Sequence, residues 1–180
     1  LGTGTGTVAR GLARRGCVVT AIDPAPQLLE QARLLDTQAG VQVDYLVARA
    51  EDTGLVGEQF AVVTAGQCWH WFDRSRAAQE AMRLLTPGGH LVIAHYDWIP
   101  LPGNVVEMTE RLILQHNPRW HMSGGTGLYP AWLNDVAVAG LTGLETFSFD
   151  SCAMYNHESW RGRIRASAGV AASLTPEQVA

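Results

Sequence analysis

The chain begins with a glycine-rich segment whose chemistry is that of a backbone ligand site. In residues 1–7, glycine occupies every second position, as Gly2, Gly4 and Gly6. Alternating glycines are poor material for the interior of a helix or strand, and they suit a turn whose backbone passes close to a ligand. Residues 8–15 then predict a short helix. Because free N–H groups and the positive end of the helix dipole would point at the ligand, we expect a nucleotide-type site.

A carboxylate further along favours the same interpretation. Asp23 follows an apolar, β-branched run and lies 17 residues past Gly6. A carboxylate at this place can accept hydrogen bonds from the hydroxyls of a ribose bound beside the glycines. Two classes of enzyme share the arrangement, namely dinucleotide-dependent enzymes and methyltransferases that use S-adenosylmethionine. The spacing does not separate them, because the fingerprint G-x-G-x-x-G/A is met when Gly4 and Gly6 are followed by Ala9.

The elements that must hold these groups alternate between strand and helix. Apolar, β-branched runs predict strands, and apolar residues three or four positions apart predict helices. The predicted order is strand 17–23, helix 27–37, strand 41–48, strand 60–66, a helix capped by Asp73 and running to about residue 85, a turn at 86–89, and strand 90–96. This alternation predicts an α/β fold with a Rossmann-like, doubly wound and mostly parallel sheet.

The second half of the chain departs from that rhythm. Residues 97–130 are rich in Pro, Trp and Gly and hold one predicted helix, at 105–115, so we expect an insertion on the substrate side of the sheet. The predicted elements beyond it are helix 131–139, strand 144–149, a helix at 157–172 capped by Asn156, and a new helix start at 175–178. We interpret residues 1–180 as a single domain whose two ends are expected to be cut.

Composition bounds the class of protein. A chain of 180 residues with 47% hydrophobic residues and a net charge of −4 is typical of one soluble globular domain. This charge does not predict a partner among nucleic acids or anionic membranes, and the apolar runs are too short to span a bilayer. The cysteines Cys17, Cys68 and Cys152 are odd in number and lack metal-ligand spacing. They predict core or near-core thiols of a reducing, cytoplasmic compartment and no metal site.

Successive motifs of this sequence resemble those of class I S-adenosylmethionine-dependent methyltransferases. The motifs are LGTGTG at 1–6, AID at 21–23, AED at 50–52 and RLLTPGG at 83–89. The segment QCWHWFD at 67–73 resembles a loop of the methyltransferase type 11 subgroup that is similar to trans-aconitate methyltransferases. The resemblance covers about residues 1–96 with specific motifs and extends loosely to 157–163. In that family a central first strand precedes the glycines and a last strand lies beyond residue 180, so we expect an unpaired slot in the sheet.

The resemblance implies a cofactor, S-adenosylmethionine, with S-adenosylhomocysteine as its product. The glycines let the backbone approach the methionine and ribose parts, Asp23 holds the ribose hydroxyls, and Glu51 lies near the adenine. The implied cofactor-binding residues are Gly2, Thr3, Gly4, Gly6, Asp23, Pro24, Ala50, Glu51 and Gln67. Other interpretations stay open: the glycines could form a plain turn, Asp23 could merely cap the next helix, and Glu51 could be a solvated acid.

The reaction that the resemblance implies needs little covalent help, because the sulfonium methyl group is already activated. Alignment of the two reactants for in-line displacement can supply about 7–11 kcal/mol of the barrier reduction. A base helps if the acceptor is a hydroxyl or an acidic carbon. His70 is the candidate catalytic residue, because it follows the third strand at the carboxyl edge of the sheet. It could instead be a structural histidine. Trp69, Trp71 and Phe72 could form the wall of the acceptor pocket, and His95 and Tyr96, which end the fourth strand on the same edge, are second-rank candidates.

Two arginines suggest the nature of the acceptor. Arg161 and Arg165 lie four residues apart and so share one face of the predicted helix. They could clamp an acidic small molecule, such as a tricarboxylate, by bidentate pairing, although a solvated helix face would also explain them. The leading hypothesis is a methyltransferase acting on a small-molecule acceptor. The alternatives are an NAD(P)-dependent oxidoreductase of Rossmann type and an inactive cofactor-binding fragment.

Overall fold

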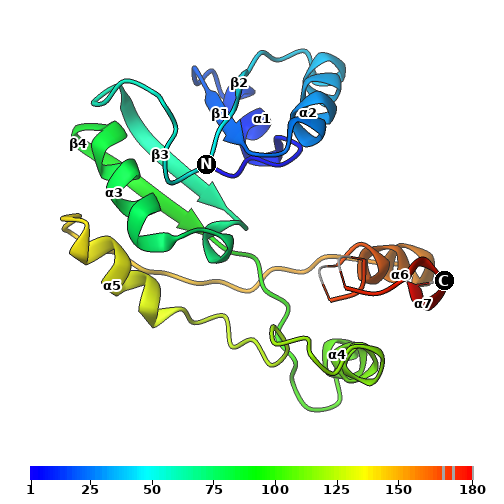
Figure 1. Cartoon of the computed structure of the whole chain (residues 1–180). Helices are drawn as coiled ribbons and strands as arrows, with labels where there is room; N and C mark the ends of the chain where they lie inside the picture. The colour runs from blue at the N-terminus through cyan, green and yellow to red at the C-terminus, as the bar shows by residue number, and fades with distance from the viewer. Residues whose placement is uncertain (168, 172, 180) are drawn as a thin grey trace. The chain divides into compact units, whose positions relative to one another are not determined.

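The computed structural model describes residues 1–167, 169–171 and 173–179 and divides into two compact units (Figure 1). The first unit comprises Leu1–Tyr96 and Tyr129–Leu144, and the second comprises Asp97–Leu128 and Glu145–Ala180. Nearly all of the range predicted as an insertion therefore belongs to the second unit. Whether that segment covers the substrate side of the sheet stays a prediction.

The strands of the first unit form two parallel pairs. Strand β1 (Thr20–Asp23) pairs with β2 (Asp44–Val47), and β3 (Phe60–Gly66) pairs with β4 (Leu85–Ala94). Parallel neighbours need a crossover between them, and helices supply both crossovers here. The predicted α/β class with parallel strands is confirmed.

The helices of the first unit begin where the sequence provides a start signal. Helix α2 has Pro26 in its first turn, and the Asp73 side chain caps α3 by accepting a hydrogen bond from the N–H of Arg76 at 3.2 Å. Gly40 ends α2 in the left-handed conformation, with φ of 66°. The helices are α1 (Thr7–Ala13), α2 (Pro26–Ala39), α3 (Arg74–Leu84), α5 (Pro130–Val138) and the 3₁₀ turn η1 (Trp69–Trp71).

The first residues of the chain contact both strand pairs. The amino group of Leu1 donates a hydrogen bond to the carbonyl of Thr64 in β3 at 2.7 Å. The N–H of Thr3 donates to the carbonyl of Ile22 in β1 at 2.8 Å. Because Thr64 and Ile22 lie near the carboxyl ends of their strands, the glycine loop (residues 1–7) lies at that edge.

Buried small side chains let the layers of the first unit pack closely. Ala77, Ala78 and Ala81 on α3 are each 0% exposed. Helix α3 packs against β3, β4 and α5 along this alanine-rich face. The largest side chain in this core is Trp69, which is 1% exposed.

The predicted starts of two strands in the first unit are wrong. Strand β1 starts at Thr20, because it pairs with β2 over only four residues, and Val18 is 97% exposed. Strand β4 starts at Leu85 and thus includes the predicted turn 86–89. A register shift lets β4 contain this segment, because Leu85 pairs with Phe60 whereas His90 pairs with Val62.

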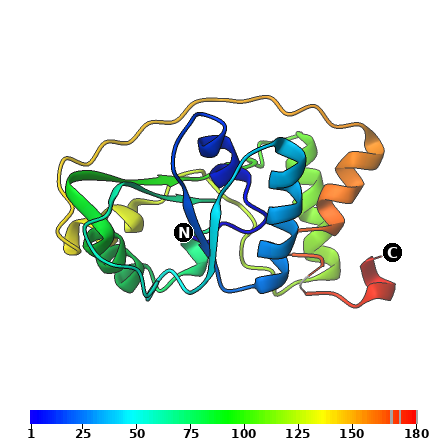
Figure 2. The same cartoon turned by 90° about the horizontal axis from the view of Figure 1, so that it is seen from above.

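The predicted strand 144–149 is also absent from the described structure. Phe147 and Phe149 are 87% and 79% exposed in an extended connection that leads from α5 to α6 (Figure 2). An alternating pattern makes a strand only if a neighbouring strand offers its backbone groups, and within the described ranges none pairs with this segment.

The second unit contains helices and no strand among its described residues. Asn104 and Asn156 cap α4 and α6 by accepting hydrogen bonds from the N–H groups three residues on, each at 2.8 Å. Helix α6 ends at Arg165, before the predicted residue 172. It buries no side chain, so packing does not extend it. The helices are α4 (Val105–His116), α6 (His157–Arg165) and α7 (Pro176–Val179).

Aromatic side chains pack around a buried acid in the second unit. Glu110 is 5% exposed and accepts hydrogen bonds from the indole N–H of Trp98 at 3.0 Å and from the N–H of Gly124 at 2.8 Å. The guanidinium of Arg163 lies 5.4 Å from the ring centre of Trp98. The ring centre of Trp160 lies 5.7 Å from that of Trp98.

The cysteines correct one prediction. Cys68 is buried, but Cys17 and Cys152 are exposed, so the prediction of three core or near-core thiols is wrong for two of them.

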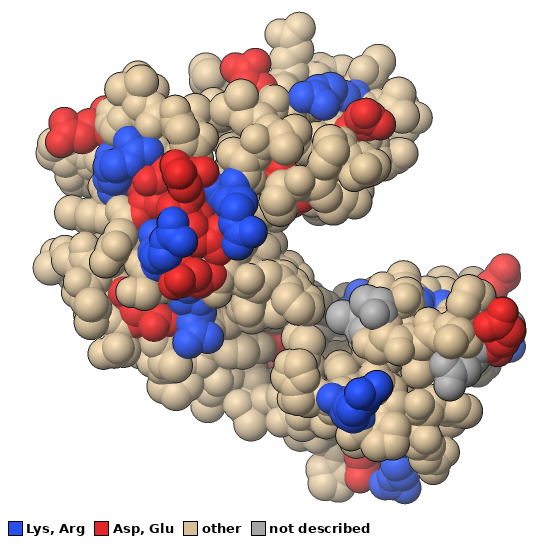
Figure 3. All heavy atoms as spheres, viewed as in Figure 1, with Lys and Arg blue, Asp and Glu red and all other residues tan. Residues whose placement is uncertain are grey.

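Acidic and basic side chains intermingle on the face seen in Figure 3. Among the described residues, no helix combines the length and the apolarity that crossing a membrane would require.

Candidate functional site

A cavity of about 570 Å³ opens beside the glycine loop in the first unit. It is lined by the loop, by α1, by the start of β1 and by the carboxyl ends of β3 and β4. This volume falls within the range of about 300–1,000 Å³ that is usual for small-molecule sites. The predicted site residues that line it are Gly2, Thr3, Gly4, Gln67, His95 and Tyr96.

The glycine loop leaves open space at one position. Gly2, Gly4 and Gly6 all have positive φ, at 58°, 54° and 80°, which favours glycine. A Cβ atom at Gly2 would meet Cys68 and Phe72 at 2.9 Å, whereas one at Gly4 would meet nothing within 4 Å. The backbone at Gly4 therefore borders space that a ligand could fill, and the loop fits a molecule that approaches the backbone closely.

The carboxylate of Asp23 is hydrogen-bonded to the backbone of the glycine loop. Its Oδ2 accepts a hydrogen bond from the N–H of Gly4 at 2.8 Å, and its Oδ1 accepts one from the N–H of Ala25 at 3.0 Å. The residue is 7% exposed, and neither it nor Pro24 lines the cavity. The contact with Ala25 lies just before α2, whose N-cap residue is Ala25 and which has no side-chain cap, so Asp23 does not cap that helix. A role toward a ribose stays a prediction, and it would use the remaining lone pairs of the carboxylate.

Glu51 is tied to the start of α3. Its Oε1 accepts a hydrogen bond from the N–H of Asp73 at 2.9 Å, and its Oε2 lies 3.4 Å from Nε of Arg49. Burial acts to raise the pKa of Glu51, but the Asp73 hydrogen bond and the Arg49 charge outweigh burial, so the pKa lies below its ordinary value. Glu51 is thus ionised at neutral pH. It and Ala50 do not line the cavity, and their place beside an adenine stays a prediction.

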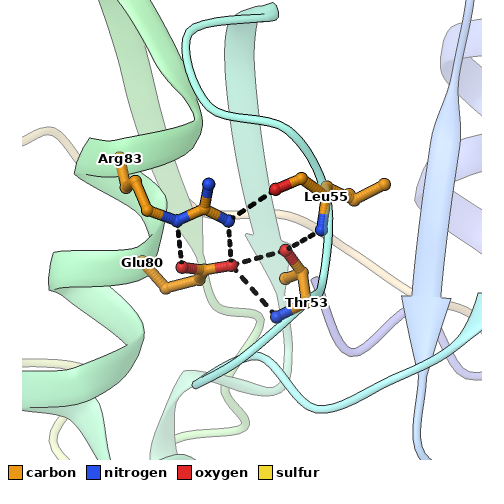
Figure 4. A network of polar contacts seen from close by, with 4 residues as sticks. All are labelled: Thr53, Leu55, Glu80 and Arg83. Carbon is orange, nitrogen blue, oxygen red and sulfur yellow. Dashed lines mark hydrogen bonds and ion pairs between the residues drawn. The ribbon is translucent and has the colours of Figure 1, made fainter.

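A second carboxylate fixes the segment that follows Glu51 (Figure 4). Glu80 on α3 accepts hydrogen bonds from the N–H and hydroxyl of Thr53, and both of its oxygens lie 2.7 Å from Arg83 nitrogens. Arg83 also donates to the carbonyl of Leu55 at 2.8 Å. The Arg83 hydrogen bonds outweigh burial and lower the pKa of Glu80 to about 2. The network holds residues 53–55 against α3.

Gln67 joins the ends of β3 and β4. Its φ of 62° is unusual for a residue other than glycine. Its side-chain amide donates to the carbonyl of Tyr96 at 3.1 Å and accepts from the N–H of Tyr96 at 2.7 Å. In these two bonds the side-chain amide of Gln67 takes the place that a backbone peptide group has between paired strands. Backbone strain of this kind concentrates at ligand sites, and Gln67 borders the cavity.

Four rings from three segments meet at the same edge, and we call them the histidine–aromatic cluster. Nε2 of His95, just after β4, lies 3.3 Å from Nδ1 of His70 in η1. The His95 ring stacks on Tyr129 and Trp132, with ring centres 4.9 Å and 5.5 Å away. Tyr129 and Trp132 stack on each other at 4.0 Å. The fold thus brings His70 and His95 together, with His95 at the cavity wall and His70 next to it.

The remaining predicted pocket residues have different places. Trp69 is a core residue at 1% exposure, which corrects its assignment to an acceptor pocket. It is buried because η1 turns the side chain of its first residue toward α3 and α5, where it joins the core cluster. Trp71 is 63% exposed, and its ring lies beside that of His70, tilted by 47°, with ring centres 4.6 Å apart. Arg161 and Arg165 belong to the second unit, and their clamp on an acidic acceptor stays a prediction.

Sequence reasoning missed Tyr129 and Trp132. Tyr129 immediately precedes α5 and Trp132 lies in its first turn, 34 and 37 positions after His95. A signal existed, because residues three apart at the start of a helix lie on the same face. It indicates that these two rings act together, but it does not say which other residues they contact.

Comparisons with known proteins agree with this geometry. The model of the methyltransferase type 11 family, described as "Methyltransferase domain", matches residues 1–93, which is just over half of the chain. The ubiquinone biosynthesis O-methyltransferase of Xanthomonas oryzae pv. oryzae is 31% identical over 171 residues, covering 93% of this chain and 69% of the relative. An uncharacterised methyltransferase of Mycobacterium bovis is 40% identical over 91 residues, covering 51% of this chain and 36% of the relative.

A solved structure also matches. The structure of a Bacillus halodurans protein superposes with a TM-score of 0.66 at 24% identity, covering 98% of this chain and 71% of that one. A match at this level of identity shows the fold alone, which is Rossmann-like. This fold agrees with the match to the methyltransferase family model.

The chain therefore belongs to the type 11 family of class I S-adenosylmethionine-dependent methyltransferases. Its activity is the transfer of a methyl group, as the resemblance implied. The family and the fold imply a cofactor of the S-adenosylmethionine type. The spacing of the glycines alone could not separate this class from dinucleotide enzymes, and the family match favours methyl transfer.

Proposed function

We propose that the protein methylates a hydroxyl oxygen of a small-molecule acceptor, with S-adenosylmethionine held in the cavity beside the glycine loop and S-adenosylhomocysteine as product. One observation carries the proposal: the open backbone at Gly4 and the polar residues Gln67 and His95 border the same cavity. The curated relative from Xanthomonas oryzae is named as an O-methyltransferase, which supports oxygen as the accepting atom.

The residues present fit such a cofactor. Gly4 can bring its backbone against the ligand, and Asp23 fixes the orientation of that backbone through the Gly4 N–H. Gln67 borders the cavity with a fixed side chain, because its amide nitrogen and its amide oxygen are both hydrogen-bonded to the backbone of Tyr96. When bound, the cofactor supplies a methyl group on a positively charged sulfur. The protein's contribution is to hold the acceptor oxygen in line with that methyl group and to exclude water.

His70 is the group we propose to receive the hydroxyl proton. It lies in η1 at the carboxyl edge of β3, and it is partly exposed, so an acceptor molecule can reach it. A base within hydrogen-bond reach of the hydroxyl contributes a factor of about 10²–10⁴ to such a reaction. Its neighbour Trp71, with a largely exposed ring, offers a flat apolar surface to an acceptor that is itself planar.

Two measurements test the proposal. Isothermal titration should show binding of S-adenosylhomocysteine and not of NAD, and binding of NAD alone would contradict the cofactor assignment. Transfer of a radiolabelled methyl group should then be measured to a catechol, an aniline and an aromatic carboxylate of similar size. We expect transfer to the catechol, and methylation of the aniline alone would replace oxygen by nitrogen as the accepting atom.

A further inference from the structure

We propose that His95 is a positioning residue that fixes the tautomer of His70, so that Nε2 of His70 is the nitrogen that receives the acceptor's proton. This inference rests on the proposed function, because it assigns a second residue to the same proton transfer. Its basis is the contact between Nε2 of His95 and Nδ1 of His70 at 3.3 Å.

The surroundings of His95 make it the positioning partner and not the base. Its Nε2 faces His70, and its Nδ1 is buried in the fold, so neither nitrogen can meet an acceptor hydroxyl. Its ring is held nearly parallel to Tyr129, at 18°, and to Trp132, at 27°. A ring stacked in this way cannot turn freely, and the direction in which its Nε2 atom points is therefore set by the core of the first unit.

The contact couples the tautomers of the two rings. A neutral imidazole carries one hydrogen, on one nitrogen, and a basic lone pair on the other. If Nδ1 of His70 donates to Nε2 of His95, the basic lone pair of His70 is on Nε2. If the hydrogen runs the other way, Nε2 of His70 carries a hydrogen and cannot act as a base. The bond made by one ring nitrogen thus decides the role of the other.

The proton transfer balances with these assignments. The proton of the acceptor hydroxyl goes to Nε2 of His70, and the electron pair of the O–H bond stays on the oxygen. The oxygen forms the new bond to the methyl carbon, and the electron pair of the S–C bond returns to sulfur. His70 is then an imidazolium whose Nδ1–H donates to neutral His95, and hydrogen bonds from a charged donor are the stronger kind.

One ion pair lies on the helices next to the cluster, where Arg74 of α3 and Asp135 of α5 pair with each other at 2.7 Å. The titratable side chains whose rings contact the His95 ring include His70 and Tyr129.

Two substitutions at His95 separate the hydrogen bond from packing. His95→Gln places an amide oxygen near the position of Nε2 and can still accept from His70, whereas His95→Phe keeps a flat ring and removes the acceptor. His90→Phe, at an exposed site of β4, is the matched control for loss of a histidine. With a catechol acceptor, we expect kcat to fall about 10- to 100-fold in His95→Phe and to recover in His95→Gln. Because His95 also borders the cavity, the KM for the cofactor is measured in parallel, and the fall in kcat should exceed any change in that KM if the affected step is proton transfer.

A second readout does not depend on activity. Long-range ¹H–¹⁵N NMR of the histidine rings, without any acceptor, should show His70 with its hydrogen on Nδ1 in the wild-type protein and in His95→Gln. In His95→Phe that preference should be lost. A wild-type His70 that carries its hydrogen on Nε2, or an unchanged kcat in His95→Phe, would overturn the inference. If the wild-type protein methylates no hydroxyl, the proposed function fails, and the NMR result still decides whether His95 sets the tautomer.

Discussion

The glycine loop and the histidine–aromatic cluster border the same edge of the first unit, but they are held in place by different forces. The loop is fixed by backbone N–H groups, as where Gly4 donates to Asp23 and Thr3 donates to Ile22. The cluster is fixed by stacked rings, because the His95 ring packs on the rings of Tyr129 and Trp132. Directional bonds to backbone groups hold one loop conformation, whereas stacked rings fill apolar volume without fixing a single backbone conformation.

Because of this difference, we expect substitutions in the glycine loop and in the histidine–aromatic cluster to impair different properties of the protein. Backbone geometry at the loop depends on φ values that few residues can adopt, whereas the cluster depends on apolar volume. A substitution that removes volume should therefore disturb the cluster and spare cofactor binding. A substitution that fills the space beside the loop should do the reverse.

The largest effect is expected from removing the ring at the base of the cluster. Trp132 is 9% exposed, so Trp132→Ala should lower the free energy of unfolding by about 3–5 kcal/mol. Trp71→Ala, at a 63% exposed site, should cost less than about 0.5 kcal/mol. Denaturant unfolding followed by circular dichroism measures both. Equal losses would show that the cluster is not a packed unit, and any folded Trp132→Ala protein should still bind S-adenosylhomocysteine.

A second prediction concerns the network of Figure 4, which joins α3 to the segment after Glu51. The pKa of Glu80 is lowered to about 2, below its unfolded value near 4.5. The carboxylate therefore contributes stability that is fully present above about pH 4.5 and is lost as the pH falls toward 2. The contribution amounts to at most about 3 kcal/mol. Glu80→Gln should lower the free energy of unfolding at pH 7 and flatten its decline between pH 4.5 and 2.

The matched control for Glu80 is a half-buried carboxylate with a similar partner. Glu107 pairs with Arg111 at 3.1 Å across one turn of α4. Glu107→Gln should lower the free energy of unfolding less than Glu80→Gln does, because solvent-accessible ion pairs within a helix contribute little. If both variants lost the same stability, burial and the additional Thr53 hydrogen bonds at Glu80 would not matter.

A third prediction fills the space beside the loop. Gly4→Ala should weaken binding of S-adenosylhomocysteine by about 10- to 30-fold, or about 1.4–2 kcal/mol. Gly40→Ala is the control, since both glycines have similar positive φ and neither has an atom within 4 Å of its Cβ position. Both variants should lose about 1 kcal/mol of stability through backbone strain. Titration calorimetry that gave the same loss of binding for both would place the ligand elsewhere.

The smallest expected effect is on a thiol that lies behind the loop. Burial raises the pKa of Cys68 to about 11, and its Sγ donates a hydrogen bond to the carbonyl of Leu1 at 3.2 Å. Alkylation at pH 7 should therefore modify the exposed Cys17 and Cys152 and leave Cys68 at least about tenfold slower. Peptide mass spectrometry follows each site. Rapid labelling of Cys68 would show that the loop opens readily.

The sequence predicted most elements of the first unit because their signals are local. The start of α3 follows from Asp73, and the end of α2 follows from Gly40. The predicted strand 144–149 failed for the opposite reason, since a strand also requires a partner that its own residues do not specify. Site residues divide in the same way. Gly4 and Gln67 were predicted and line the cavity, whereas Trp69 was predicted as a wall and is in the core.

By itself, the sequence determined the class of fold, the glycine loop and the family, because these depend on residue types at fixed short spacings. The tertiary structure alone decided which side chains meet. It showed that the carboxylates of Asp23 and Glu51 accept hydrogen bonds from backbone N–H groups, and that His70 and His95 share a contact. Such contacts join residues 19–25 positions apart, so signals that act over a few neighbouring residues do not specify them.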